Sequence, residues 1–263
     1  MSRKRVMEMR QFSILASLAV TLAICIAAQD AGAQARAGAA SPGAAAVEKA
    51  SKGNKYLFFF FWREDTQHSR VMRGVFQAAM AKVADKADSI EIQTGDPAEQ
   101  PIVDRYGASR APMPLVLSIA PNGAITKGFP SRFEESQLLQ AFVSPGTADC
   151  MKALQDRKLV LLVVQQPAAQ VKQVSLQKGV QDFATDEQYG KNTKVVVVNP
   201  GDPKETSFLK SLQVDPQATG PVTVLMVPPG SVVGTFPGDV TKAELIAKLK
   251  SASSCGPNCS CHH

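Results

Sequence analysis

The chain has 263 residues, of which 44% are hydrophobic and 20% are charged, and its formal net charge is +6. This composition supports a buried core and excludes a disordered, collagen-like or multi-span membrane protein. At about 100–200 residues per domain, the length suits one large domain or two small ones.

The first 35 residues have the order of a secretory signal peptide. A basic stretch in residues 3–10 precedes an apolar run at 12–28, and small residues around Ala33 and Ala35 follow. This order predicts cleavage after one of these two alanines, with an uncleaved membrane anchor as the alternative, because the apolar run approaches spanning length. We therefore expect an exported protein, periplasmic or secreted, with no membrane span once residues 1–35 are removed.

Cleavage also lowers the positive charge. Cutting after Ala35 removes four cations and two anions, so the net charge falls from +6 to +4. The remaining chain has no run of Lys and Arg, and its one Trp, Trp62, provides no stacking platform. We therefore expect no nucleic-acid partner.

Residues 36–53 are rich in Ala, Gly and Ser and show no hydrophobic periodicity. Such a composition is typical of a flexible linker.

Beyond the linker, the chain repeats itself. Pro114 to Gly123 has the same spacing from Pro to Gly as Pro221 to Gly230, at an offset of 107 residues, and each segment is followed by a Phe-Pro pair. Upstream, Gly95-Asp96-Pro97 is echoed by Gly201-Asp202-Pro203 at an offset of 106. Short matches in the same order at a near-constant offset predict two copies of one domain, which we place at residues 54–146 and 147–252.

Within a copy, the predicted order of elements is β-α-β-α-β-β-α. Tyr56–Trp62 is a continuous apolar run of strand length, and apolar residues recur at helical spacing through residues 72–83. A short strand at 89–93 precedes a helix that starts near Pro97, and the Pro-Asn-Gly turn at 121–123 predicts a hairpin.

The last helix of each copy is predicted from its N-terminal pattern. Ser131-x-x-Glu134 and Thr241-x-x-Glu244 both have the form of a capping box. The second copy has a longer stretch between its first two strands, with a helical pattern that ends near Phe183.

This order, with a proline directly before the hairpin, resembles the thioredoxin fold. In that family a cis-proline precedes the third strand and faces the active-site helix, and Pro114 and Pro221 stand at the matching positions. Trp62 matches the Trp that ends the family's central strand. The resemblance covers nearly all of residues 54–251 and implies the α/β class, with two tandem domains that each have a central mixed β-sheet flanked by helices.

The redox motif of that family is absent. Where the family has Cys-x-x-Cys, this chain has Thr66, Gln67, His68 and Ser69, and Phe60 replaces the family's buried acid. Disulfide exchange needs a thiolate of lowered pKa and a second thiol, and hydroxyl groups supply neither. The matching segment of the second copy, residues 165–169, has no Cys. We therefore expect neither domain to be an ordinary disulfide oxidoreductase, which argues against an enzyme without closing the question.

His68 stands where protein disulfide isomerases have the His of their CGHC motif. One interpretation is a polar binding spot beside Met113-Pro114 for a peptide strand or a metal; the other is an exposed His in the first turn of a helix. An acyl-transfer site of Ser69 and His68 lacks an identified third member to orient the imidazole. Tandem thioredoxin-like proteins without CxxC commonly keep the cis-proline groove for partners, so the resemblance implies a protein or peptide partner there.

The tail, residues 253–263, holds three of the chain's five cysteines and two of its three histidines: Cys255, Cys259, Cys261, His262 and His263. Thiolate and imidazole ligands suit Cu(I) or Zn(II), so the tail is a candidate site for a soft metal ion. Structural disulfides are an alternative, for example Cys255–Cys259 with Cys261 joined to Cys150. CGPNC also resembles the family's CGPC with one residue inserted, which would make the tail a redox-active dithiol, and a tail with no role is the last possibility.

Together these patterns predict an exported, non-catalytic binding or scaffold protein whose tail holds Cu or Zn. The alternative is a thiol–disulfide oxidoreductase or redox-related protein that works through the tail cysteines. Cys150 is predicted to be a small buried residue in a short helix that opens the second copy.

Overall fold

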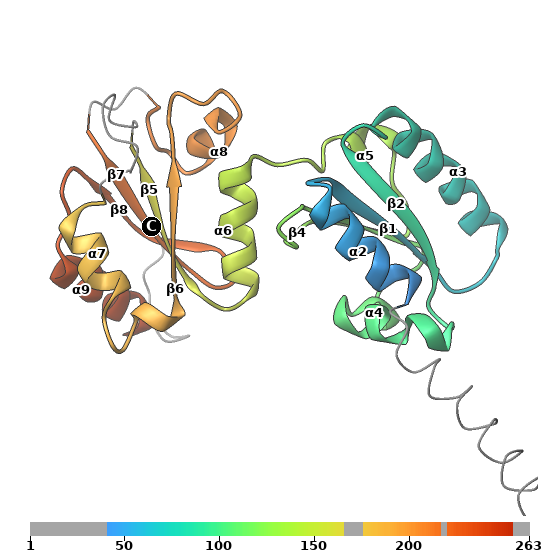
Figure 1. The fold of residues 1–263 in the computed structure, drawn as a ribbon, viewed down its shortest axis with the longest axis horizontal. Helices are drawn as coiled ribbons and strands as arrows, with labels where there is room; N and C mark the ends of the chain where they lie inside the picture. The colour runs from blue at the N-terminus through green and yellow to red at the C-terminus, as the bar shows by residue number, and fades with distance from the viewer. Residues whose placement is uncertain (1–40, 166–175, 217–219, 255–263) are drawn as a thin grey trace, which may run out of the picture. The chain divides into compact units, whose positions relative to one another are not determined.

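The computed structural model describes residues 41–165, 176–216 and 220–254. Within these residues the chain forms two domains, each built on a four-stranded mixed sheet with helices packed against it (Figure 1). The first domain consists of α2 (Pro42–Lys52), β1 (Tyr56–Trp62), α3 (Gln67–Lys82), β2 (Ala87–Gln93), α4 (Gln100–Arg105), β3 (Leu115–Ile119), β4 (Ile125–Pro130) and α5 (Glu135–Leu139). The second consists of α6 (Pro145–Gln155), β5 (Leu159–Val164), α7 (Lys178–Ala184), β6 (Thr193–Val198), α8 (Thr206–Ser211), β7 (Val222–Val227), β8 (Ser231–Pro237) and α9 (Lys242–Ser254).

The two sheets have the same topology. The strand order is β2-β1-β3-β4 in the first and β6-β5-β7-β8 in the second. In each, the two strands that precede the hairpin are parallel, and the hairpin pairs antiparallel to the central strand. The predicted α/β class and tandem thioredoxin-like arrangement are therefore confirmed.

β1 is a central strand because it is apolar on both faces. The side chains of Phe58–Phe61 are fully buried. On one face Phe60 packs 5.3 Å from Phe76 of α3, and on the other Phe59 lies 5.1 Å from Tyr106, which follows α4. A strand covered on both faces needs no polar alternation, which explains the unbroken apolar run.

The predicted hairpin between β3 and β4 is present. Asn122 accepts a hydrogen bond through Oδ1 from the backbone N–H of Ala124 at 3.0 Å, and Gly123 has φ +84°. A glycine adopts this left-handed conformation without steric cost, so the Pro-Asn-Gly sequence suits the turn.

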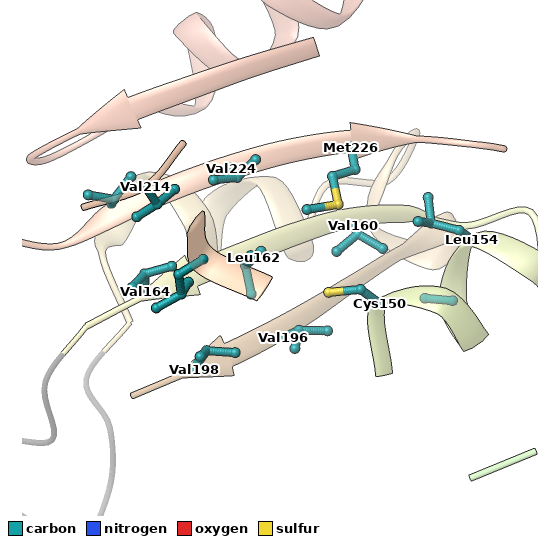
Figure 2. Packing of buried hydrophobic residues seen from close by; sticks show 13 residues of the cluster. Cys150, Leu154, Val160, Leu162, Val164, Val196, Val198, Val214, Val224 and Met226 are labelled. Carbon is teal, nitrogen blue, oxygen red and sulfur yellow. The ribbon is translucent and has the colours of Figure 1, made fainter. Parts of the chain in front are cut away.

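In the second domain, helices cover both faces of the sheet. One apolar cluster joins α6 and α8 to alternate residues of the strands, including Leu162 and Val224 (Figure 2). A second cluster joins α7 and α9 to the opposite face through residues such as Val163 and Phe183.

The expectation of a flexible linker at 36–53 is wrong for residues 42–52, which form α2. Ala is the strongest helix former, and Pro42 occupies the first turn, where its missing N–H is not needed. Ser41 accepts a hydrogen bond through Oγ from the N–H of Ala44 at 3.1 Å and caps the helix. The composition that favours a linker also favours a helix, and a small buried residue such as Ala50 contributes little to apolar periodicity.

The domain boundary also differs slightly from the expected one. Ser144 is the N-cap of α6, with its Oγ accepting from the N–H of Thr147 at 3.2 Å, and α6 packs on the second sheet. The second domain therefore begins at Ser144 rather than at residue 147.

The N-terminal cap is as predicted in the last helix of the second domain but not in that of the first. Thr241 and Glu244 form the predicted reciprocal pair, with Thr241 N–H donating to Glu244 at 2.8 Å. In the first domain the cap lies three residues later, on Glu134 and Gln137, and α5 begins at Glu135. Ser131 instead takes a left-handed conformation with φ +61°, which removes it from the helix.

Within the described ranges, no helix has both the length and the apolar character to cross a membrane. The predicted signal peptide, the helical pattern at 171–174 and most of the tail lie outside those ranges.

Candidate functional site

The four residues at the redox-motif positions open α3, directly after the loop that follows β1. Thr66 is the N-cap, and its Oγ1 accepts from the N–H of Ser69 at 3.1 Å. Thr66, Gln67 and His68 are exposed, whereas Ser69 is only 6% exposed. The local structure follows from the sequence, because Thr is a strong N-cap residue. Ser69 lies three residues later, where a backbone N–H donates to the N-cap side chain.

The two hydroxyl groups are bonded to each other. Thr66 Oγ1 lies 3.0 Å from Ser69 Oγ, and Ser69 Oγ donates to the backbone oxygen of Glu64 at 2.9 Å. Both oxygens are thus satisfied by neighbours within the loop and the first turn. This arrangement stabilises the start of the helix and supplies no thiolate and no activated nucleophile.

The position of the family's buried acid also has no ionisable side chain. Phe60 is fully buried and packs on Phe76, so no carboxylate is available beneath the helix start to accept a proton.

His68 does not serve Ser69. Its Nε2 lies 2.8 Å from the backbone oxygen of Ser131 and, because a carbonyl oxygen only accepts, the imidazole N–H must donate. Ser69 donates to Glu64 instead, so the described residues contain no Ser–His pair of the kind acyl transfer requires. The imidazole ties α3 to the segment after β4.

The same segment contacts the proline loop. The Met113–Pro114 bond is cis, and the N–H of Ser131 donates to the oxygen of Pro114 at 2.7 Å. His68, Ser131 and Met113-Pro114 therefore meet at one edge of the sheet. Ser131 also belongs to this edge, and its left-handed φ is a property that no sequence pattern signals.

Pro221 differs from the expected cis-proline. Among the described residues of the second domain, the cis bond is Pro228–Pro229, in the turn between β7 and β8, and the bond before Pro221 is not cis. The oxygen of Pro221 still accepts from the N–H of Gly238 at 2.8 Å, which repeats the Pro114–Ser131 bond. The backbone pairing is conserved between the copies, while the isomer is not. The segment that corresponds to the redox motif in this domain lies outside the described residues beyond Gln165.

Charged side chains of α3 form ion pairs with neighbouring residues. Asp65 pairs with Arg70 at 3.1 Å and with Arg73 at 3.3 Å. The guanidinium of Arg73 also lies 4.9 Å from the centre of the Trp62 ring and 2.8 Å from Glu91. Trp62 is therefore partly covered by Arg73.

Cys150 is the one cysteine among the described residues, and it lies in an apolar core. It is 3% exposed, and its side chain points from α6 toward Leu162 and Val196 (Figure 2). Burial in this apolar core, with smaller contributions from the nearby carboxylates of Asp149 and Glu205, raises the pKa of the thiol to about 12. The thiol is thus neutral and unreactive at physiological pH.

The candidate metal ligands Cys255, Cys259, Cys261, His262 and His263 lie outside the described residues. Among the residues that are described, no group of three or more His, Cys, Asp and Glu side chains could hold a metal ion.

No protein-family model matches this sequence, and no curated protein is similar to it. Among solved structures, the first two thioredoxin domains of Saccharomyces cerevisiae Eps1p are similar over 80% of this chain and 95% of theirs, at 11% identity and a TM-score of 0.28. The germline-specific thioredoxin Deadhead of Drosophila melanogaster covers 35% of this chain and 81% of its own, at 17% identity and a TM-score of 0.29. The oxidoreductase DsbH covers 38% and 81%, at 14% identity and a TM-score of 0.30.

The sheet topology, and not these low TM-scores, defines the fold of each domain. The protein has a thioredoxin-like fold in tandem, and this similarity says nothing about its activity.

Proposed function

We propose that this is an exported binding or scaffold protein in which the thioredoxin-like domains do no redox chemistry. The observation that carries the proposal is the start of α3, where Thr66 and Ser69 hydroxyls, 3.0 Å apart, occupy the positions of the two family thiols. A hydroxyl cannot form a mixed disulfide, so these residues leave a helix start suited to contact and not to electron transfer.

The partner in this proposal is a protein or peptide that contacts the edge around Met113-Pro114. This edge offers a half-exposed Met113 and Trp62, and Val71 of α3 is 55% exposed. Extended peptides are recognised through main-chain hydrogen bonds, which give affinity, and side-chain contacts, which give specificity. Export is proposed from the signal-peptide pattern alone.

The C-terminal tail is proposed to hold one soft metal ion, Cu(I) or Zn(II). Support comes from the density of thiol and imidazole ligands in residues 255–263. Burial of Cys150 adds to it, because a thiol that is 3% exposed inside the α6 core is closed to a bond with Cys261. The three cysteines of the tail are an odd number, which leaves at least one of their thiols outside any disulfide formed among them.

Metal uptake by the reduced protein tests the tail. We expect about one equivalent of Cu(I) or Zn(II) to bind to the intact chain, and none to a chain that lacks residues 255–263. A Cys150→Ala variant is the matched control and should bind as the intact chain does. Unchanged uptake after removal of the tail would contradict the proposal.

The second candidate, an oxidoreductase that works through the tail, is separated by insulin reduction with dithiothreitol. We expect no acceleration above the uncatalysed rate. Acceleration that is lost in Cys255→Ser and Cys259→Ser variants would overturn the non-catalytic proposal and favour the redox-active tail.

A further inference from the structure

Three arginines surround the cis-proline edge without a carboxylate partner. Arg63 follows β1, Arg110 precedes β3 and Arg132 follows β4, and all three are exposed. None of them forms an ion pair with any described residue, in contrast to Arg70 and Arg73 on the same side of the domain.

The strand register brings these arginines together. Phe61 of β1 pairs with Leu115 of β3, and Leu115 pairs with Pro130 of β4. These three residues therefore lie side by side across the sheet, over about 10 Å, since neighbouring strands are about 4.8 Å apart. Arg63 and Arg132 each stand two residues beyond this row, at the same edge.

Hydrogen bonds between the loops hold the cluster around Met113-Pro114. The guanidinium of Arg63 donates to the oxygen of Ser109 at 3.0 Å, directly before Arg110. Ser131, the residue before Arg132, donates its N–H to the oxygen of Pro114 at 2.7 Å and accepts from His68. The arginines are thus carried by loops that are bonded to one another.

The acidic side chains at this edge do not cancel the arginines. Asp65 is engaged by Arg70 and Arg73, and Glu134 is held in the capping box of α5. Glu64 and Asp96, in the loops after β1 and β2, are the remaining exposed carboxylates at this edge, and neither forms an ion pair within the described residues. Three unpaired cations against two unpaired anions leave an excess of one positive charge.

We propose that this edge binds an extended acidic peptide, with Arg63, Arg110 and Arg132 facing successive carboxylates. The inference rests on the proposed function, to which it adds the chemistry of the partner. Charges spread over three loops suit a chain with several carboxylates better than a single small anion, and guanidinium groups pair with carboxylates through two parallel hydrogen bonds. The half-exposed Met113 provides apolar contact beside them.

Fluorescence anisotropy with three labelled peptides of equal length tests the charge preference. The peptides alternate Thr with Glu, Gln or Lys. We expect the Glu peptide to bind at least about tenfold more tightly than the Lys peptide, and its affinity to fall as salt is raised from about 50 to 200 mM. Equal or stronger binding of the Lys peptide would overturn the inference.

Two sets of variants locate the binding site. Arg63→Ser, Arg110→Ser and Arg132→Ser combined should weaken the Glu peptide about tenfold, because each exposed charge contributes a few-fold. The matched control combines Lys191→Ser, Lys194→Ser and Lys210→Ser, three exposed lysines of the second domain without ion pairs within the described residues, and removes the same charge elsewhere. An equal loss in both sets would show attraction to net charge alone and contradict the assigned edge.

A Met113→Ala variant separates this inference from the function on which it rests. Weaker binding of the Gln peptide in this variant, with no effect of the arginine set on any peptide, would keep the groove as a binding site and overturn the acidic partner. Binding of no peptide, or binding that neither change affects, would overturn both. Thermal unfolding of each variant shows whether the fold is intact.

Discussion

The start of α3 contains no cysteine, and the cysteine of α6, Cys150, is buried. Thr66 and Ser69 place oxygen at the two positions where exchange chemistry needs thiols, and their hydrogen bond of 3.0 Å closes the first turn. Cys150, in contrast, retains its sulfur but lies in an apolar core. At the scale of single residues, the hydroxyls at positions 66 and 69 and the burial of Cys150 leave the described part of the chain without a thiolate at physiological pH.

This burial predicts a pH-dependent contribution of Cys150 to stability. The pKa of the thiol is about 12 in the folded protein and about 8.5 in an unfolded chain. Because the folded state holds the proton more tightly, the stabilisation is complete below about pH 8.5 and is lost as pH rises toward 12. A chain with every other cysteine replaced by Ser should react with Ellman's reagent at pH 8 about a thousandfold more slowly than after unfolding in urea. Fast reaction of the native protein would contradict the buried position.

At the scale of elements, the first helix of each domain begins with the same tripeptide. Ser41-Pro42-Gly43 opens α2, and Ser144-Pro145-Gly146 opens α6. The Gly-Asp-Pro repeat likewise extends to a glutamate, Glu99 in one copy and Glu205 in the other, and both are buried. In the second domain Glu205 accepts from Ser144 Oγ at 2.5 Å and from the N–H of Gly146 at 2.8 Å. A carboxylate thus closes the positive end of α6.

The close approach of the Glu205 carboxylate to the start of α6 requires glycine at position 146. A Cβ added there would lie 2.6 Å from Val198 and 2.9 Å from the Glu205 carboxylate. We expect Gly146→Ala to lower the free energy of unfolding of the second domain by about 1–3 kcal/mol. Gly74→Ala, on the exposed side of α3 with open space around it, is the matched control and should raise stability by about 1 kcal/mol. Urea denaturation measures both, and a neutral Gly146→Ala would show that the contact is not tight.

The elements that sequence patterns predicted are those with a single physical interpretation. The run of aromatic residues in β1 is compatible with a doubly covered strand, and Pro-Asn-Gly with a turn, whichever neighbours they have. The remainder depends on tertiary context. Ala-rich residues suit α2 as well as a linker, Ser131 and Glu134 compete to cap α5, and the cis bond of the second domain lies at Pro229 instead of Pro221. At the candidate site, the exchange of Cys for Thr66 and Ser69 was predictable, whereas the grouping of Arg63, Arg110 and Arg132 required the strand register.

At the scale of the whole molecule, the largest apolar clusters of the two sheets have no residue in common. The core around Phe60 and Phe76 is drawn from residues 56–142, and the two clusters of the second sheet from residues 150–249. The one Trp of the chain, Trp62, packs against the first core. Its fluorescence therefore reports the unfolding of the first domain, while circular dichroism reports both.

This division predicts that a change in one core leaves the other transition in place. Glu205→Ala removes the acceptor for Ser144 and Gly146 and should cost about 2–3 kcal/mol in the second domain, because it leaves a buried donor unpaired. We expect the circular dichroism transition to separate into two steps while the midpoint of Trp62 fluorescence stays constant. Phe76→Ala is the reciprocal variant: a cavity in the first core costs about 3–5 kcal/mol and should lower the Trp62 midpoint. If Glu205→Ala moved the Trp62 midpoint as far as the circular dichroism midpoint, the two domains would unfold as one cooperative unit, and the separation of their cores would carry no thermodynamic consequence.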